Sequence, residues 1–414
     1  MAWNPKKAPK NLRVPRRPKS TLALVSRTPR VALLLDPLSL SLDVQGLRVK
    51  WASHAPELAR EFLGRGYHVR GFGAPPGVIP RSSTDIEAED GREPGRSLAH
   101  FAPDWIVAYD CLSPAALRGA RMARKLGATL VLVEGAWKGS LSWKDLILRR
   151  IGETLWGPYV RRTAGAVVAL DPLAEEQAVH DGFAREIVRV IPQGVDVLAY
   201  RPGLASTLVA RHKIRGRILL YLGKLAGARG VTLLLDAFSR TVGQRSDWNL
   251  VYAGQGPERG ELRAMADRLG VGDRVHWIEP REEELPGLLG ASTVLAVPAQ
   301  GNEVVGRYVA RALACGLPIL ASDLPRLRAF VEAEENGLLV SAPSVEAWSE
   351  AIQRTASSPV TRSRWARNSR RLAEERYSWS AVATRFEQVF LEAQQRVQAK
   401  ISSRATGGGA YAGR

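Results

Sequence analysis

The sequence has little cysteine and no long apolar run. Its 414 residues include two cysteines, Cys111 and Cys315, which lie far apart and have no His or Cys neighbours at metal-ligand spacing. We therefore expect no disulfide framework, and a reducing cytoplasm fits this composition. No apolar segment approaches the roughly 18 residues that a membrane-spanning helix needs. A cytoplasmic protein is predicted, attached to a membrane peripherally if at all.

Several catalytic motifs are missing too. The chain has no G-x-x-x-x-G-K-[ST] phosphate loop, no G-x-S-x-G nucleophile turn and no H-E-x-x-H metal motif. The acidic run Asp85–Asp90 lies in the polar segment 78–96, which we interpret as a solvated loop and not as a cation site. We expect neither an obligatory metal nor a bound cofactor.

The positive charge is unevenly distributed along the chain. The formal net charge is +18, and residues 1–30 hold nine Lys or Arg, five prolines and no acidic residue. Half of the excess therefore lies on residues 1–30, and we place a tail with the composition of a disordered arm at residues 1–29. Such an arm favours an anionic membrane surface or nucleic acid through nonspecific electrostatics, and the alternative is a solubilising tail. No base-reading module accompanies it, so a nucleic-acid partner has no other support.

From residue 30 onward, short apolar segments alternate with amphipathic ones. The alternation occurs twice, which predicts an α/β protein of two similar units with parallel sheets and a cleft between them. We place the first unit at residues 30–203 and the second at 204–378. A helix is expected at 379–400, followed by a flexible, glycine-rich tail at 401–414.

The stretch 301–323, GNEVVGRYVARALACGLPILASD, is the most informative part of the chain. It follows the apolar strand Val294–Val297 and contains Glu303, Gly306 and then the helix-like run Arg307–Ala314. In open parallel sheets, ligands bind beyond the carboxyl ends of the strands. The backbone N–H groups at the start of a helix also favour an anion there. We therefore expect Glu303 and Gly306 to line a ligand site.

This stretch resembles the donor-sugar signature of family 4 glycosyltransferases, which have two Rossmann-like domains (the GT-B fold). The segment RALACGLPILASD, from Arg311, matches the family's EAMACGLPVVASD nearly residue for residue. The resemblance implies an N-terminal acceptor domain, a C-terminal nucleotide-sugar donor domain and a last helix that crosses back onto the N-terminal domain. It also implies that Glu303 contacts the donor sugar. The family's second glutamate, which contacts the nucleotide ribose, is replaced here by Arg311.

Arg311 has two interpretations. Eight residues are a little over two helical turns, so Arg311 is expected on nearly the same face as Glu303. A guanidinium cannot accept hydrogen bonds from ribose hydroxyls. It either pairs with an acid or reaches a donor phosphate or an acidic sugar, and we favour the second.

Two glycine-rich turns follow strands of the second unit. Gly223 opens the first turn, where Lys224 and Arg229 occupy the basic positions of the family pattern G-R-L-x-x-x-K-G in exchanged order. The resemblance implies that both cations hold the donor diphosphate, and preplaced cations stabilise the charge that builds on a leaving diphosphate. Gly256 belongs to a G-x-G-P-E turn that either lines the donor pocket or only connects strand to helix. Ile278 falls where the family's nucleotide base packs, so main-chain contacts to the base are expected there.

The N-terminal unit matches the family less closely. Gly46 is a candidate for the glycine turn after the first strand, and Glu134 occupies a segment where the family often has a histidine. We assign both to the acceptor side. His54 is interpreted as a structural histidine. The amphipathic segment Trp143–Tyr159 suits either a membrane interface or packing on its own domain, and we favour packing.

The sequence therefore predicts a metal-independent, retaining glycosyltransferase that moves a sugar from a nucleoside-diphosphate donor to an unidentified acceptor. Two alternatives stay open. The missing histidine and Arg311 favour a noncatalytic sugar-nucleotide-binding or scaffold protein, and the basic tail favours a transferase acting on nucleic acid.

Overall fold

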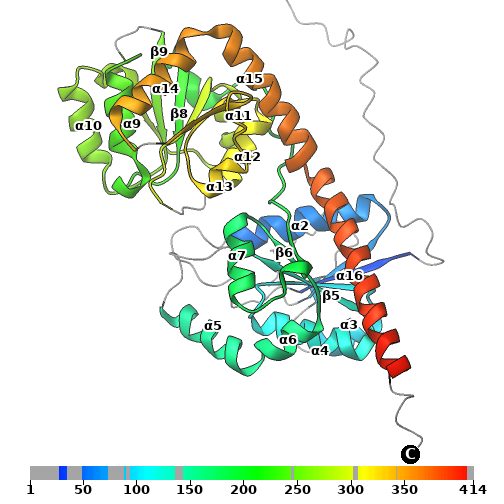
Figure 1. Cartoon of the computed structure of the whole chain (residues 1–414). Coiled ribbons are helices and arrows are strands. Elements are labelled where there is room, and N and C mark those ends of the chain that lie inside the picture. Colours follow the sequence, from blue (N-terminus) through cyan, green and yellow to red (C-terminus); the bar gives the residue numbers. More distant parts are fainter. Residues whose placement is uncertain are drawn as a thin grey trace, which may run out of the picture.

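The computed structural model describes residues 28–34, 49–72, 88–89, 94–135, 143–243, 247–301, 306–341 and 343–407. In these residues the chain forms two parallel sheets, each with helices packed beside it (Figure 1). The predicted fold class, two Rossmann-like α/β units, is confirmed.

The first sheet has seven parallel strands in the order β3-β2-β1-β4-β5-β6-β7. The strands are β1 (Arg30–Leu34), β2 (His68–Phe72), β3 (Ala88–Glu89), β4 (Trp105–Tyr109), β5 (Thr129–Glu134), β6 (Ala164–Ala169) and β7 (Val188–Val190). Every residue of β4, β5 and β6 is buried, as expected for a parallel sheet covered on both faces. The short edge strand β3 lies within the segment expected to be a loop, so that expectation was wrong at Ala88–Glu89. This edge strand consists of only two residues, which pair through their backbones with Gly71 and Phe72. A strand so short has no side-chain pattern by which the sequence could predict it.

The helices of this unit are α2 (Val49–Gly64), α3 (Pro94–Phe101), α4 (Pro114–Leu126), α5 (Trp143–Leu155), α6 (Gly157–Thr163) and α7 (Pro172–His180). Local sequence explains where α4 begins and ends. The Ser113 hydroxyl accepts from the Ala116 N–H, Pro114 fills the first helical position, and Gly127 ends the helix in a left-handed conformation. α7 begins in the same way, because the Asp171 carboxylate accepts from the Ala174 N–H.

The second sheet has six parallel strands in the order β10-β9-β8-β11-β12-β13. The strands are β8 (Arg217–Leu222), β9 (Trp248–Ala253), β10 (Val275–Ile278), β11 (Val294–Val297), β12 (Ile319–Ser322) and β13 (Gly337–Val340). The helices are α8 (Thr207–Arg211), α9 (Val231–Ser239), α10 (Arg259–Arg268), α11 (Leu285–Gly290), α12 (Gly306–Ala314), α13 (Pro325–Arg328), α14 (Val345–Ser357) and α15 (Pro359–Leu372). The strand order reverses between β8 and β11, which is where open α/β sheets bind ligands.

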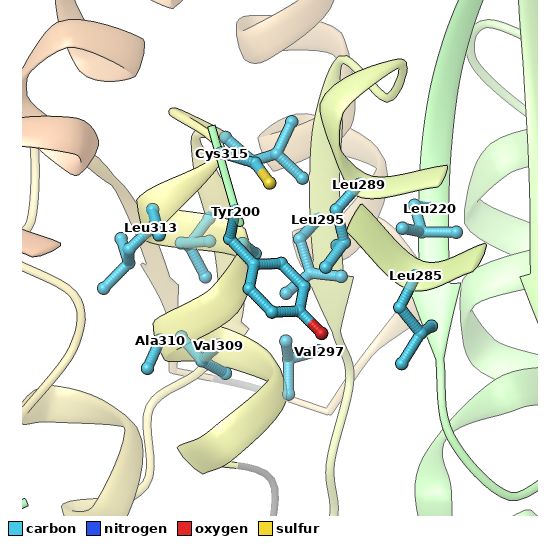
Figure 2. Packing of buried hydrophobic residues seen from close by; sticks show 14 of the residues in the cluster. Tyr200, Leu220, Leu285, Leu289, Leu295, Val297, Val309, Ala310, Leu313 and Cys315 are labelled. Carbon is cyan, nitrogen blue, oxygen red and sulfur yellow. The ribbon is translucent and has the colours of Figure 1, made fainter. Parts of the chain in front are cut away.

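The core beside this reversal is apolar and includes Tyr200. Figure 2 shows the Tyr200 ring among Leu285 and Leu289 of α11, Val297 of β11 and Val309 of α12. These side chains hold α11 and α12 against β8 and β11. The packing therefore fixes the first turns of α12 relative to the ends of these strands.

The last helix, α16 (Trp379–Gly407), runs from the second unit along the first (Figure 1). The predicted crossing is confirmed by its packing on α2, β5 and β6. A buried ion pair joins Arg65 to Glu387 at 2.8 Å, with both side chains 2% exposed, and the Tyr67 hydroxyl donates to the same carboxylate. The helix extends seven residues beyond the expected end at residue 400, because no glycine interrupts it before Gly407.

Two contacts between the units lie away from α16. The Val195 N–H donates to the Tyr377 carbonyl at 2.7 Å, so the two connecting segments run side by side. The Asp196 carboxylate accepts from the N–H groups of Leu198 and Ala199, which fixes the turn that follows this contact. Arg326 of α13 pairs with Asp171, at the start of α7, at 2.8 Å. The carboxyl end of β6 therefore faces the second unit.

Candidate functional site

The candidate donor site lies at the carboxyl ends of β8, β9 and β10. The loops that follow these strands are bonded to one another. The Gly223 N–H donates to Ala253, the Gly254 N–H to Ile278, and the Leu225 N–H to Gln255. A continuous set of main-chain bonds thus joins the predicted diphosphate turn, the G-x-G-P-E turn and the predicted base-binding segment.

Gly256 has a packing role in this set of loops. A Cβ at this position would lie 2.0 Å from the Leu225 carbonyl oxygen, so a larger residue would force the two loops apart. Glu258 completes the contact, because its carboxylate accepts from the Gly227 N–H and its own N–H donates to Leu225. The turn therefore shapes the site by close loop packing. A direct donor contact by Gly223 or Gly256 stays a prediction.

The two candidate diphosphate-binding cations lie on the first loop. Lys224 is exposed, and its carbonyl accepts from the Tyr221 hydroxyl at 2.7 Å, which anchors the loop to β8. Arg229 is half-buried and precedes Gly230, the residue just before α9. Gly230 has φ 68°, and a Cβ there would lie 2.0 Å from the Pro298 carbonyl oxygen, just beyond β11. This approach places the start of α9, with its electropositive N–H groups, against the end of β11.

Of the two further residues predicted on the donor side, Ile278 lies within the described residues and Glu303 does not. Ile278 is buried at the end of β10, and its carbonyl accepts from Gly254. Glu303 lies in residues 302–305, outside the described residues, between the end of β11 and the start of α12 at Gly306. Its contact with a donor sugar stays a prediction.

Arg311 pairs with an acid, the first of its two interpretations. Its guanidinium forms an ion pair with Glu282, which lies just after β10, and rests over the Tyr200 ring at 5.0 Å from the ring centre. The Arg311 side chain is 12% exposed, whereas that of Glu282 is 56% exposed. The contact with a donor phosphate, which we favoured, stays a prediction.

On the acceptor side, Glu134 is the last residue of β5 and is completely buried. Its Oε2 accepts from the Cys111 N–H at 3.0 Å, and its Oε1 lies 3.7 Å from Arg149 of α5 without a hydrogen-bond partner in the described part of the chain. The Leu170 N–H donates to the Glu134 carbonyl, so Glu134 lies beside the strand end that faces the second unit. Gly46 lies outside the described residues.

Sequence reasoning missed Arg149. Its guanidinium pairs with Asp181 and also approaches Glu134 and Asp110, so one cation serves three carboxylates. The available signal was its position on α5, away from the apolar residues Ile147 and Ile151. Burial and, to a lesser extent, the nearby Asp110 raise the pKa of Glu134 to about 7, against the opposing effect of Arg149.

His54 is a structural histidine, as expected. It is buried, its Nδ1 lies 3.0 Å from the Tyr109 hydroxyl, and its ring packs edge-on against Trp379. Burial lowers the pKa of His54 to about 3, so the ring is neutral near pH 7.

No group of three or more His, Cys, Asp or Glu side chains in the described ranges is arranged to hold a metal ion. Within those same ranges, no helix has the length and apolar character needed to cross a membrane.

Comparison with known proteins identifies the second unit. Residues 209–372 match the family model described as glycosyl transferases group 1. The match covers the C-terminal unit from α8 to α15. The candidate donor site, from Gly223 to Arg311, lies entirely within it.

Curated proteins with similar sequences match this chain over part of their length. A D-inositol 3-phosphate glycosyltransferase of Xylanimonas cellulosilytica is 30% identical over 226 residues, which are 51% of this chain and 53% of the relative. A protein of the same name from Saccharomonospora viridis is 29% identical over 64% of this chain and 63% of its own length. The match thus spans between about half and two thirds of these relatives.

Solved structures share the whole two-domain GT-B fold. A glycosyltransferase from Rickettsia africae superposes with a TM-score of 0.68 at 12% identity, covering 88% of this chain and 98% of that one. Anabaena Alr3699/HepE, solved with UDP and glucose, has a TM-score of 0.62 at 18% identity and covers 90% and 99%. At these identities the likeness shows the fold.

The pKa of Glu134 gives a prediction about stability. Because the native pKa of about 7 exceeds the ordinary 4.5, the protonated carboxyl stabilises the fold. This contribution is complete below about pH 4.5 and is lost as the pH rises through about 7. In Glu134→Gln the amide stays neutral at every pH. The free energy of unfolding of this variant should therefore fall less than that of the wild type between about pH 5 and 8, by roughly 1–3 kcal/mol. Denaturant titrations at several pH values measure this difference, and parallel profiles would contradict it.

Proposed function

We propose that this protein transfers a sugar from a nucleoside-diphosphate sugar to an acceptor with retention of anomeric configuration. The observation that carries the proposal is the set of interlocked glycine loops, which presents Lys224, Arg229 and the start of α9 beyond β8. Two cations beside a helix N-terminus favour a diphosphate. The UDP complexes of Anabaena Alr3699/HepE, which has the same fold, support this choice of ligand.

The chemistry follows from charge. When the bond between the anomeric carbon and the diphosphate oxygen breaks, negative charge grows on the leaving group, and Lys224 and Arg229 stabilise it. The acceptor oxygen then bonds to the same face of the sugar, and its proton passes to the departing phosphate. This route needs neither a separate base nor a metal from the protein, and Glu303 orients the sugar. The predicted metal independence is tested by turnover in excess EDTA.

The main alternative is a noncatalytic sugar-nucleotide-binding protein. A panel of UDP, GDP and ADP sugars, screened by thermal stabilisation, selects the donor. A donor at 100 times its dissociation constant should stabilise the fold by roughly 2.7 kcal/mol. Hydrolysis or transfer of that donor supports the transferase, whereas binding without any turnover supports the alternative.

We also propose that α5 of the acceptor side contacts an anionic membrane surface. Ile147, Ile151 and Leu155 lie four residues apart and are 49%, 41% and 73% exposed. Arg149 on the same helix reaches into the protein to Glu134, while the Arg150 side chain is 83% exposed. An exposed apolar stripe beside a cation suits the membrane interface.

Ile151→Asp with Leu155→Asp is expected to abolish sedimentation with anionic phospholipid vesicles. Burial of the two side chains contributes about 1.5–3 kcal/mol each, so their loss outweighs the retained charge. The thermal midpoint of the variant serves as the control for folding of the first unit, and nucleoside-diphosphate affinity serves as the control for the other unit. Equal sedimentation of the variant and the wild type would show that α5 does not contact the membrane.

A further inference from the structure

The Glu282–Arg311 ion pair joins two segments that border the candidate donor site. Glu282 lies four residues after the end of β10, and Glu279, the first residue after that strand, accepts from the Gln255 side chain of the G-x-G-P-E turn at 2.5 Å. Arg311 lies on α12, which starts beyond β11. The pair therefore connects the predicted base-binding segment to the helix that follows Glu303.

The two partners differ in exposure. Arg311 is held on two sides, by the Glu282 carboxylate and by the Tyr200 ring, and its side chain is 12% exposed. Its Nη1 is buried and has no hydrogen-bond partner in the described ranges. The Glu282 side chain, in contrast, is 56% exposed. A fixed cation thus holds a carboxylate that solvent and ligands can reach.

Exposed ion pairs contribute little to stability, so stability alone gives no strong reason for this arrangement. Its chemistry does suit a vicinal diol. A carboxylate accepts hydrogen bonds from hydroxyl groups. The largely buried guanidinium of Arg311 holds the exposed Glu282 carboxylate in one position.

We propose that the Glu282–Arg311 pair binds the ribose hydroxyls of the donor nucleotide, with Glu282 accepting from them and Arg311 positioning Glu282. The inference rests on the proposed function, since it assumes a nucleoside-diphosphate donor. It assigns the ribose contact to a carboxylate that comes from a different segment than the signature helix α12. Arg311 then supports donor binding through Glu282 and not through a phosphate.

The test compares nucleoside diphosphates with their 2′,3′-dideoxy analogues by calorimetry, using UDP, GDP and ADP. The wild type should bind the preferred diphosphate about ten- to a hundredfold more tightly than its dideoxy analogue, as expected for a hydrogen bond to a charged group. Glu282→Ala should lose that same factor with the ribonucleotide and show no further loss with the analogue. Glu283→Ala is the matched control, because Glu283 is the next residue and its side chain is 67% exposed.

Exchanging the charges of Glu282 and Arg311 tests whether Arg311 positions the carboxylate or has only a general structural role. Arg311→Glu places two carboxylates together, so it should weaken binding of the ribonucleotide. Glu282→Arg with Arg311→Glu restores an ion pair and a carboxylate, and it should recover affinity to within about threefold of the wild type while keeping discrimination against the dideoxy analogue. Thermal midpoints report whether each variant is folded.

The outcomes separate this inference from the proposed function. If the wild type binds the diphosphate but Glu282→Ala still discriminates against the dideoxy form, the ribose assignment is wrong and the transferase proposal stands. Tighter binding in Arg311→Glu alone would also overturn it, because that result returns the ribose contact to α12. Failure of the wild type to bind any nucleoside diphosphate would contradict the proposed function itself.

Discussion

A variant with both Lys224→Ala and Arg229→Ala is expected to lose nucleoside-diphosphate and nucleotide-sugar binding together. Hydrogen bonds to charged groups contribute about 1.5–3 kcal/mol each, so removing both should weaken binding by roughly a hundred- to ten-thousandfold. The loss should be the same for the free diphosphate as for the full donor, because neither cation is assigned to the sugar. Calorimetry with the diphosphate alone measures it.

The control for this variant removes the same charge elsewhere on the unit. Arg215 and Arg268 are exposed and lie outside the glycine loops, so Arg215→Ala with Arg268→Ala should bind the diphosphate nearly as the wild type does. Equal losses in the two double variants would indicate only a general effect of net charge. Unchanged affinity in Lys224→Ala with Arg229→Ala would place the phosphates at another site.

Glu303→Gln should have the opposite signature, with binding retained and transfer nearly abolished. Glu303 follows the strand β11 and precedes the helix α12, and it is assigned to orient the sugar. Losing a contact that is made mainly in the transition state costs about 3–4 kcal/mol, or roughly a hundred- to a thousandfold in rate. Single-turnover transfer at saturating donor isolates this step from binding.

Calorimetry provides the internal control for Glu303→Gln, since affinity for the free diphosphate should stay within about twofold of the wild type. Transfer at the wild-type rate would show that Glu303 has no part in the reaction. A parallel loss of diphosphate affinity would indicate instead that the substitution disturbs the loops around Lys224.

Local sequence predicted most of the fold because the signals that specify it are local. Strands such as Trp105–Tyr109 and Thr129–Glu134 are continuous apolar runs, as buried parallel strands require. Their alternation with helices indicated parallel sheets and crossovers. The edge strands β3 and β13 were missed, since Ala88–Glu89 has only two residues and Gly337–Val340 begins with glycine.

The two-unit α/β architecture, the glycine-rich turns and the candidate cations Lys224 and Arg229 were identified from the sequence by itself, because each is recognised from residue types at short spacing. Only the tertiary structure decided that Arg149 serves three carboxylates and that Arg311 holds Glu282. These contacts join segments far apart in sequence, and no periodicity encodes which side chains meet when strands and helices pack. The raised pKa of Glu134 has the same origin, since burial and the approach of Asp110 exist only in the folded chain.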